Sequence, residues 1–347
     1  MKRLQQSGLV LFLGTIGFGT TQNLRASQEL PRSMAAIGDS ITAGAIANYR
    51  RTAFLNPLTL FPLLIDVASL IKSKSINAFD NRMLTWSTGQ DRHLRMASHQ
   101  DFLEFMGGHQ MHVYNASISG SKSYDTPKQA RNIVRWSNEK LGGQGVDYVT
   151  ILIGGNDTCR NKIKDMTSLH RFAESVDESI RELKTHAGHT KILLSSVPNV
   201  QLLKEVAENA IVQGVGPLAT CRKVWDVGGP CKTVTDVKTK EEKAAVKERL
   251  LGYNQVLADM VEDYERRFPG TMKYGKSVYK TPFEAKHLAP DCFHPNFMGQ
   301  NLLSKKSFRD TWWADDFSKV AESFEKDRAL KKRKLRRKRL RRMRRKR

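Results

Sequence analysis

The stretch SMAAIGDSIT, residues 33–42, joins an apolar run to a glycine–aspartate turn and a serine. A short apolar run that stops at glycine is typical of a buried β-strand. The residues that follow, from Ile41 onward, can begin a helix. The sequence therefore predicts a strand, a tight turn and a helix, with Ser40 directly beyond the carboxyl end of the strand.

Further strands and helices are predicted along the chain. Short apolar or β-branched runs that end at Gly, Asn or Pro lie at residues 111–114, 148–153 and 191–197. Apolar residues at helical spacing occur at residues 128–141, 169–184 and 241–267. Strands that alternate with helices favour right-handed crossovers and a mainly parallel sheet covered on both faces. The sequence thus predicts an α/β fold.

Polar segments follow three of the predicted strands or lie near the end of the chain. Ser40 follows the first strand, residues 115–120 follow the second, and residues 154–157 follow the third. Asp291 and His294 come much later, in the segment DCFHP. Because ligands of parallel sheets bind beyond the carboxyl ends of the strands, we expect these segments to form one site.

The residue types in these segments suit acyl transfer. A serine hydroxyl becomes a good nucleophile when an imidazole accepts its proton and a carboxylate orients that imidazole. Ser40, His294 and Asp291 can fill these roles, and Gly120 N–H and the Asn156 amide can stabilise an oxyanion. Each residue alone also fits an ordinary structural role, as a helix cap, a turn residue or a surface histidine. The ordered set favours a serine hydrolase.

The chain resembles the SGNH/GDSL hydrolase superfamily, and within it the phospholipase B branch. The resemblance is carried by AAIGDSITAG (35–44), WSTGQD (86–91), NASISGSKSYDTPKQA (115–130), TILIGGNDTC (150–159) and DCFHP (291–295). It implies a three-layer α/β/α sandwich around a mainly parallel, five-stranded, flavodoxin-like sheet. It also implies a catalytic triad of Ser40, Asp291 and His294, with oxyanion donors from Ser40 N–H, Gly120 N–H and Asn156. Gln90 and Thr158 depart from the pattern, where Gly and Leu are expected.

These observations predict an exported serine esterase or lipase that hydrolyses carboxylic acyl esters, with phospholipids as one candidate substrate. The alternatives are a deacetylase of carbohydrates or other small esters, a thioesterase, and a non-catalytic binding module held on an anionic surface. No cofactor and no metal are expected, because the sequence has no CxxC motif or His/Cys cluster. His93, His99, His109 and His112 also lack the spacing of metal ligands.

The two ends of the chain differ from the part between them. Lys2 and Arg3, an apolar stretch at 9–18 and small residues after it predict a signal peptide within residues 1–27, with a membrane anchor as the alternative. The hydrolase domain is expected over residues 28–327, and the mature protein outside the cytoplasm. The formal net charge is +23, and 15 of the 20 residues in 328–347 are Lys or Arg.

Such a density of like charges predicts a disordered tail. We expect this tail to contact an anionic membrane or an acidic cell-surface polymer, and nucleic acid less readily in an exported protein. A solvated tail without a partner is the alternative.

The four cysteines, Cys159, Cys221, Cys231 and Cys292, allow three pairings. A local disulfide between Cys221 and Cys231 is one of them, and it leaves Cys159 to pair with Cys292. A free buried thiol is the alternative for either of the remaining two.

Overall fold

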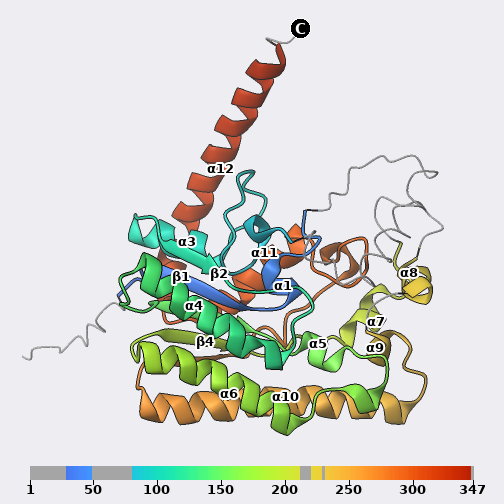
Figure 1. Cartoon of the computed structure of the whole chain (residues 1–347). Helices are drawn as coiled ribbons and strands as arrows, with labels where there is room; N and C mark the ends of the chain where they lie inside the picture. The colour runs from blue at the N-terminus through green and yellow to red at the C-terminus, as the bar shows by residue number, and fades with distance from the viewer. Residues whose placement is uncertain (1–28, 49–79, 212–219, 229–230, 345–347) are drawn as a thin grey trace, which may run out of the picture.

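A computed structural model describes residues 29–48, 80–211, 220–228 and 231–344 of the chain (Figure 1). The predicted signal peptide at residues 1–27 lies outside these residues. Within the described ranges, no helix has both the length and the apolar composition that are needed to cross a bilayer.

The centre of the fold is a five-stranded sheet in which all neighbouring strands are parallel. The strand order is β2-β1-β3-β4-β5. The bounds are β1 Ser33–Gly38, β2 His112–Asn115, β3 Tyr148–Leu152, β4 Lys191–Ser195 and β5 Met272–Gly275. The predicted α/β fold with a parallel sheet is therefore confirmed. The edge strand β5 has no apolar run in its sequence, Met-Lys-Tyr-Gly, which is why no strand was predicted there.

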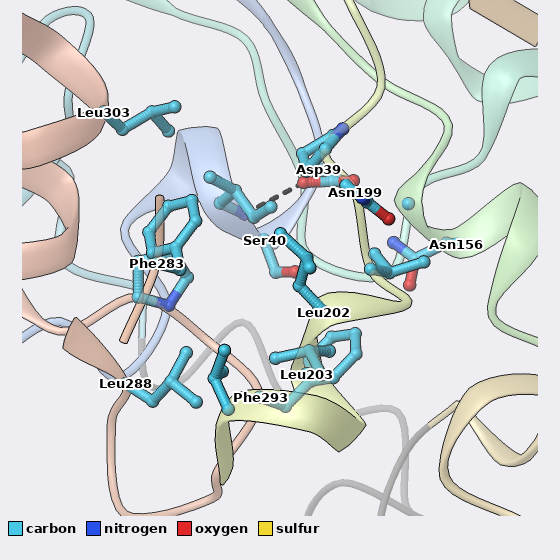
Figure 2. Close-up of a pocket in the computed structure, with 16 residues that line it drawn as sticks. Asp39, Ser40, Asn156, Asn199, Leu202, Leu203, Phe283, Leu288, Phe293 and Leu303 are labelled. Atoms are coloured by element: carbon cyan, nitrogen blue, oxygen red, sulfur yellow. Dashed lines mark hydrogen bonds between the residues drawn. The ribbon is translucent and has the colours of Figure 1, made fainter. Parts of the chain in front are cut away.

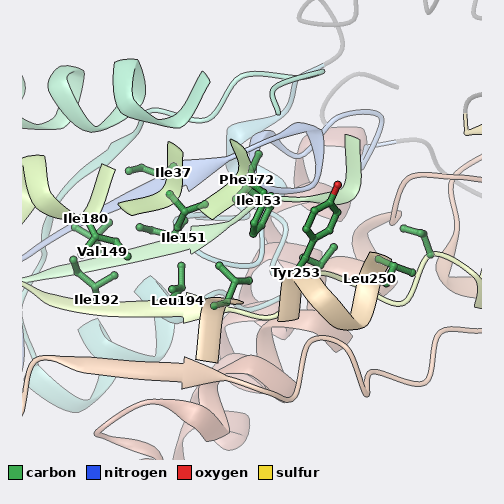
Figure 3. Packing of buried hydrophobic residues seen from close by; sticks show 14 of the residues in the cluster. Ile37, Val149, Ile151, Ile153, Phe172, Ile180, Ile192, Leu194, Leu250 and Tyr253 are labelled. Atoms are coloured by element: carbon green, nitrogen blue, oxygen red, sulfur yellow. The ribbon is translucent and has the colours of Figure 1, made fainter. Parts of the chain in front are cut away.

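Three long helices cover one face of the sheet: α4 Thr126–Lys140, α6 Leu169–His186 and α10 Lys240–Arg267. Every second residue of the central strands points toward them and is fully buried. Figure 3 shows Val149 and Ile151 of β3 beside Ile192 and Leu194 of β4, with Phe172 and Tyr253 from the helices packed nearby. This alternation is what a sheet covered on both faces requires.

The opposite face packs against α3 His99–Gly107, α11 Phe297–Ser307 and the first part of α12 Ala314–Arg344. Met34 and Tyr148 point to this side and contact a cluster of aromatic side chains. Trp313 is fully buried in that cluster, and its Nε1 donates a hydrogen bond to Glu29 O at 3.1 Å. The start of α12 is thus fixed to the domain.

The polybasic segment is helical in the structure, whereas its charge density predicts a disordered tail. It continues α12 as helix as far as Arg344, and α12 leaves the body of the molecule (Figure 1). Nucleation is the costly step of helix formation, and the docked first turns supply it. Lys, Arg and Leu are then good helix formers, which opposes the repulsion among the like charges. Arg328, which the sequence analysis assigns to the tail, is buried and donates hydrogen bonds to Leu94 O and Met96 O.

The disulfides differ from the local pairing that the sequence allows. Cys159 is bonded to Cys231, and Cys221 is bonded to Cys292. The local Cys221–Cys231 pair does not form, because α8 Cys221–Gly228 lies between the two residues. A helix of eight residues is about 12 Å long, whereas bonded cysteines need Cα atoms within about 7 Å.

Candidate active site

Ser40 lies where the turn after β1 becomes the short helix α1 Ser40–Ala43. Asp39 caps this helix, since its Oδ1 accepts a hydrogen bond from Ile41 N at 2.9 Å. Gly38 allows the close packing of the turn: a Cβ there would lie 2.5 Å from Thr42 Oγ1 and 2.7 Å from Leu152 O. The local sequence thus presents the Ser40 hydroxyl at the carboxyl edge of the sheet, as predicted.

His294 and Asp291 come from the loop before α11, and the fold brings both to Ser40. His294 Nε2 lies 2.8 Å from Ser40 Oγ, and His294 Nδ1 is hydrogen-bonded to Asp291 Oδ2. All three residues are buried, with at most 4% of their surface exposed. Asp291 Oδ1 accepts hydrogen bonds from Phe293 N and His294 N, both at 3.1 Å. Such a chain of groups can remove a proton from the serine hydroxyl.

Asn296 holds this loop in place. Its Oδ1 caps α11 by accepting hydrogen bonds from Met298 N and Gly299 N. Its Nδ2 donates hydrogen bonds to Lys286 O and Leu288 O, both at 2.8 Å. Asp291 therefore does not cap the helix, and its carboxylate is left to pair with His294.

The two segments with predicted oxyanion donors lie near Ser40: Asn156 lines the same pocket, and Ile118 N, two residues before Gly120, donates a hydrogen bond to Gly38 O at 3.2 Å. Gly120 has a φ of 83°, a left-handed conformation that favours glycine. Asn156 lies in the short helix α5 Gly155–Thr158, and its Nδ2 donates a hydrogen bond to Ser121 O at 2.9 Å. Within the described ranges, neither Ser40 N–H nor Gly120 N–H has a hydrogen-bond acceptor.

Gln129 of α4 ties these segments together, and its role has no signal in the local sequence. Its Oε1 accepts a hydrogen bond from Gly38 N at 2.9 Å, and its Nε2 donates to Gly38 O and to Ser121 Oγ, both at 3.0 Å. Asp157 adds a second brace by accepting hydrogen bonds from Ser123 N at 2.9 Å and Ser123 Oγ at 2.7 Å. The loop geometry around Ser40 is therefore fixed from two sides.

Three carboxylates act on the pKa of His294. Burial would lower this pKa, but the charge and hydrogen bond of Asp291, together with Asp39 and Asp80, raise it above its ordinary value. Burial also raises the pKa of Asp39, to about 6, against the opposing hydrogen bond from Ile41 N. The pKa of Asp80 is raised by burial as well, while its bond from Ser119 Oγ opposes this. Asp80 was not recognised in the sequence.

An apolar pocket opens beside Ser40 (Figure 2). The space between its walls is about 650 Å³ when the open solvent at its mouth is counted. Its polar rim is Asp39, Ser40, Asn156 and Asn199, and the rest of the lining is mainly aliphatic and aromatic: Ile41, Val200, Leu202, Leu203, Val206, Phe283, Leu288, Phe293 and Leu303. One wall is the helix α7 Leu202–Ala207, in a region whose sequence is irregular and gave no prediction.

The histidines His93, His99, His109 and His112 are not gathered into one group of possible metal ligands. His99 is fully buried, with Nδ1 2.9 Å from Tyr148 Oη and Nε2 2.8 Å from Ser307 Oγ. Burial lowers its pKa to about 3, so it is a neutral core residue. Among the residues that the structure describes, no group of His, Cys, Asp and Glu is arranged to hold a metal ion.

Comparison with known proteins places the chain in a family. The model of the GDSL-like lipase/acylhydrolase family matches residues 34–306. No curated protein gives a significant match. The similar solved structures include an extracellular lipase from Streptomyces rimosus, with 12% identity, coverage of 80% of this chain and 99% of that one, and a TM-score of 0.41.

Two further similar structures are an esterase from Pseudoalteromonas and an enzyme from a lake metagenome. The psychrotrophic esterase EstA from Pseudoalteromonas sp. has 10% identity, coverage of 80% and 96%, and a TM-score of 0.40. LAE5, an alpha/beta hydrolase enzyme from the metagenome of Lake Arreo in Spain, has 16% identity, coverage of 82% and 95%, and a TM-score of 0.43.

The protein has a parallel sheet with a serine, a histidine and an aspartate at one edge. It therefore belongs to the class of ester hydrolases with an α/β fold. More specifically, the chain belongs to the GDSL-like lipase/acylhydrolase family, because the family model spans most of its length.

Proposed function

We propose that this protein hydrolyses carboxylic acyl esters through a covalent acyl-enzyme on Ser40. The observation that carries the proposal is the row of hydrogen bonds from Ser40 Oγ through His294 to Asp291, buried beside an apolar pocket. In the first step His294 Nε2 accepts the proton of Ser40 while Oγ attacks the ester carbonyl carbon. The imidazolium then returns this proton to the departing alcohol.

In the second step water takes the place of the alcohol. His294 accepts a proton from it, the hydroxide attacks the acyl carbon, and Ser40 leaves with the proton that His294 returns. Asp291 does not change its protonation, since its role is to orient the imidazole and stabilise its charge. The raised pKa of His294 is consistent with this role.

We assign the oxyanion donors to Ser40 N–H, Gly120 N–H and Asn156 Nδ2. The two backbone groups have no acceptor among the described residues, and the Asn156 amide has a second hydrogen besides the one that it donates to Ser121 O. Donors that are already in place when negative charge develops lower the barrier without reorganisation.

The apolar pocket is the site we assign to the acyl chain. Its lining can bury hydrocarbon next to Ser40. Each CH₂ group removed from water makes the free energy of binding more favourable by about 0.8 kcal/mol. A sugar that filled the pocket would place most of its hydroxyl groups against aliphatic and aromatic side chains, away from the polar rim. The pocket therefore favours lipid esters, including the acyl esters of phospholipids, over carbohydrate acetates.

The proposed location is outside the cytoplasm. Two disulfides form among the described residues, and disulfides persist mainly in oxidising compartments. The predicted signal peptide gives the same location, although residues 1–27 lie outside the described part of the chain.

Labelling with a fluorophosphonate probe, combined with hydrolysis assays, tests this proposal. The wild-type protein should be labelled on Ser40 and should hydrolyse p-nitrophenyl esters and phosphatidylcholine. Ser40→Ala should remain folded, lose the label and lose about 10⁴-fold or more in kcat. Labelling and turnover of Ser40→Ala close to those of wild type would contradict the assignment. A folded wild-type protein without either signal would support the non-catalytic binding module.

A further inference from the structure

The basic arm is the most strongly charged surface of the described molecule. We use this name for residues 331–344 of α12. Eight of the nine residues from Lys331 to Arg339 are Lys or Arg, and all nine are exposed. Because successive residues of a helix are rotated by about 100°, these charges lie on every side of the helix.

The arm is a firm extension of the domain. Phe324 is buried among Phe102, Phe105 and Phe317, and the guanidinium of Arg328 lies 5.4 Å from the centre of the Phe324 ring. Arg328 also donates to Met96 O at 2.7 Å. These contacts fix the last turns before the arm, and the arm then leaves the body (Figure 1).

The charge of the arm is largely uncompensated. Lys331 forms an ion pair with Asp327 at 2.7 Å, and no acidic residue follows Asp327 in the sequence. At 1.5 Å per residue, the segment from Lys331 to Arg339 carries one positive charge about every 1.7 Å. This density is comparable to that of phosphates along duplex DNA. Such a rod gathers counterions, and their release drives its binding to an opposite polymer.

The shape of the charged surface favours a polymer over a membrane. A helix that lies in a membrane interface needs an apolar face. The arm has three apolar residues, Leu335, Leu340 and Met343, against eleven Lys and Arg, so it has no continuous apolar face and a flat bilayer would meet the charges of one side only. A flexible polymer can follow the helix and use charges around it.

The disulfides favour one class of polymer. Cys159–Cys231 and Cys221–Cys292 fit an oxidising compartment outside the cytoplasm. Nucleic acids belong mainly to the inside of the cell, so an acidic polysaccharide is the linear polyanion that suits this location. We propose that the basic arm binds a linear acidic polysaccharide outside the cell. This binding is independent of catalysis at Ser40, and it would hold the enzyme at a surface rich in such polymers.

Three variants of the full chain test the proposal. The first ends after Leu330, which keeps the contacts of Arg328. The second replaces the eight Lys and Arg residues of 331–339 by Gln, which keeps the length and removes eight of the arm's eleven positive charges. The matched control replaces Lys331, Lys332, Lys334 and Lys338 by Arg, which keeps the charge. Far-UV circular dichroism and thermal melting verify the folding of each variant.

Binding is measured to heparin and to alginate, with neutral dextran, phosphatidylglycerol vesicles and duplex DNA as comparisons at the same salt concentration. Wild type and the Arg control should bind heparin and alginate at least about tenfold more tightly than the other two variants, and salt should weaken this binding steeply. Equal binding by the Gln variant would overturn the role of the arm. Tighter binding to vesicles or to DNA than to both polysaccharides would overturn the choice of partner.

Discussion

Cys221 is disulfide-bonded to Cys292, and Cys292 lies in the sequence between Asp291 and His294. The bond attaches α8 covalently to the loop that carries the proposed base and its orienting carboxylate. Cys292 has a φ of 57°, which a residue other than glycine rarely adopts. The surrounding structure must therefore hold this conformation, and the disulfide is one of the restraints that do so.

Removing this disulfide should affect both stability and catalysis. We expect Cys221→Ala to lower the free energy of unfolding by about 2–5 kcal/mol, because a long loop is no longer closed in the unfolded chain. It should also lower kcat, because Asp291 and His294 lose a restraint. Urea denaturation and hydrolysis of p-nitrophenyl butyrate at a temperature where the variant is folded measure the two effects.

Cys231→Ala is the matched control, because the Cys159–Cys231 disulfide spans 72 residues and the Cys221–Cys292 disulfide spans 71. The two variants should lose similar stability, and Cys221→Ala should lose more of its kcat. If folded Cys221→Ala kept the kcat of wild type, the disulfide would have no part in positioning His294.

Asp80→Asn should move the acid limb of kcat/KM to lower pH. The negative charge of Asp80 is one of the causes that raise the pKa of His294, and it stabilises the imidazolium form. Without it the imidazolium loses its proton more easily, so the neutral base persists at lower pH. The pH profile of kcat/KM for a soluble ester measures the shift.

Asp263→Asn serves as the control for this profile, because Asp263 is half exposed near the end of α10 and forms ion pairs with Arg266 and Arg267. Its profile should coincide with that of wild type. The interpretation is wrong if Asp80→Asn and wild type have the same acid limb.

Local sequence was sufficient to predict the parts of the site that depend on neighbouring residues. The turn at Gly38 and Ser40 follows an apolar run, and the Asp291–His294 pair lies within one loop. In both cases the residues that allow the prediction lie within a few positions of the residues that are predicted. The parallel sheet followed from the alternation of apolar runs with helical patterns, and it placed these segments at one edge.

Other parts of the site depend on contacts between distant residues. Gln129 is an ordinary polar residue of a helix in the sequence, yet in the fold it bonds to Gly38, 91 residues away. Leu202, Leu203 and Val206 form a pocket wall only because the fold brings α7 to the pocket beside Ser40. The helical arm was missed for a related reason, since its first turns are supported by Phe324 and Arg328 and its own charges oppose folding.

Asn156→Ala should reduce kcat by about 10²–10³-fold while KM changes little. The proposed role of its amide is to stabilise charge that exists mainly in the transition state. The variant also loses the hydrogen bond to Ser121 O, so thermal melting is needed to show that the fold persists. A higher KM with unchanged kcat would instead make Asn156 a substrate-positioning residue.

Leu203→Trp should shorten the acyl chain that the enzyme accepts. Leu203 lies in α7 and lines the pocket opposite the side that carries Ser40 (Figure 2). An indole ring in its place would occupy space that we assign to the acyl chain, and a closely packed wall relaxes only in part. We therefore expect kcat/KM for p-nitrophenyl decanoate to fall about tenfold or more, while kcat/KM for the acetate ester stays within about threefold of wild type.

Leu203→Met, which conserves the volume, should keep the chain-length preference of wild type and control for the loss of leucine itself. A parallel loss for acetate and decanoate in a folded Leu203→Trp would show that the acyl chain binds elsewhere.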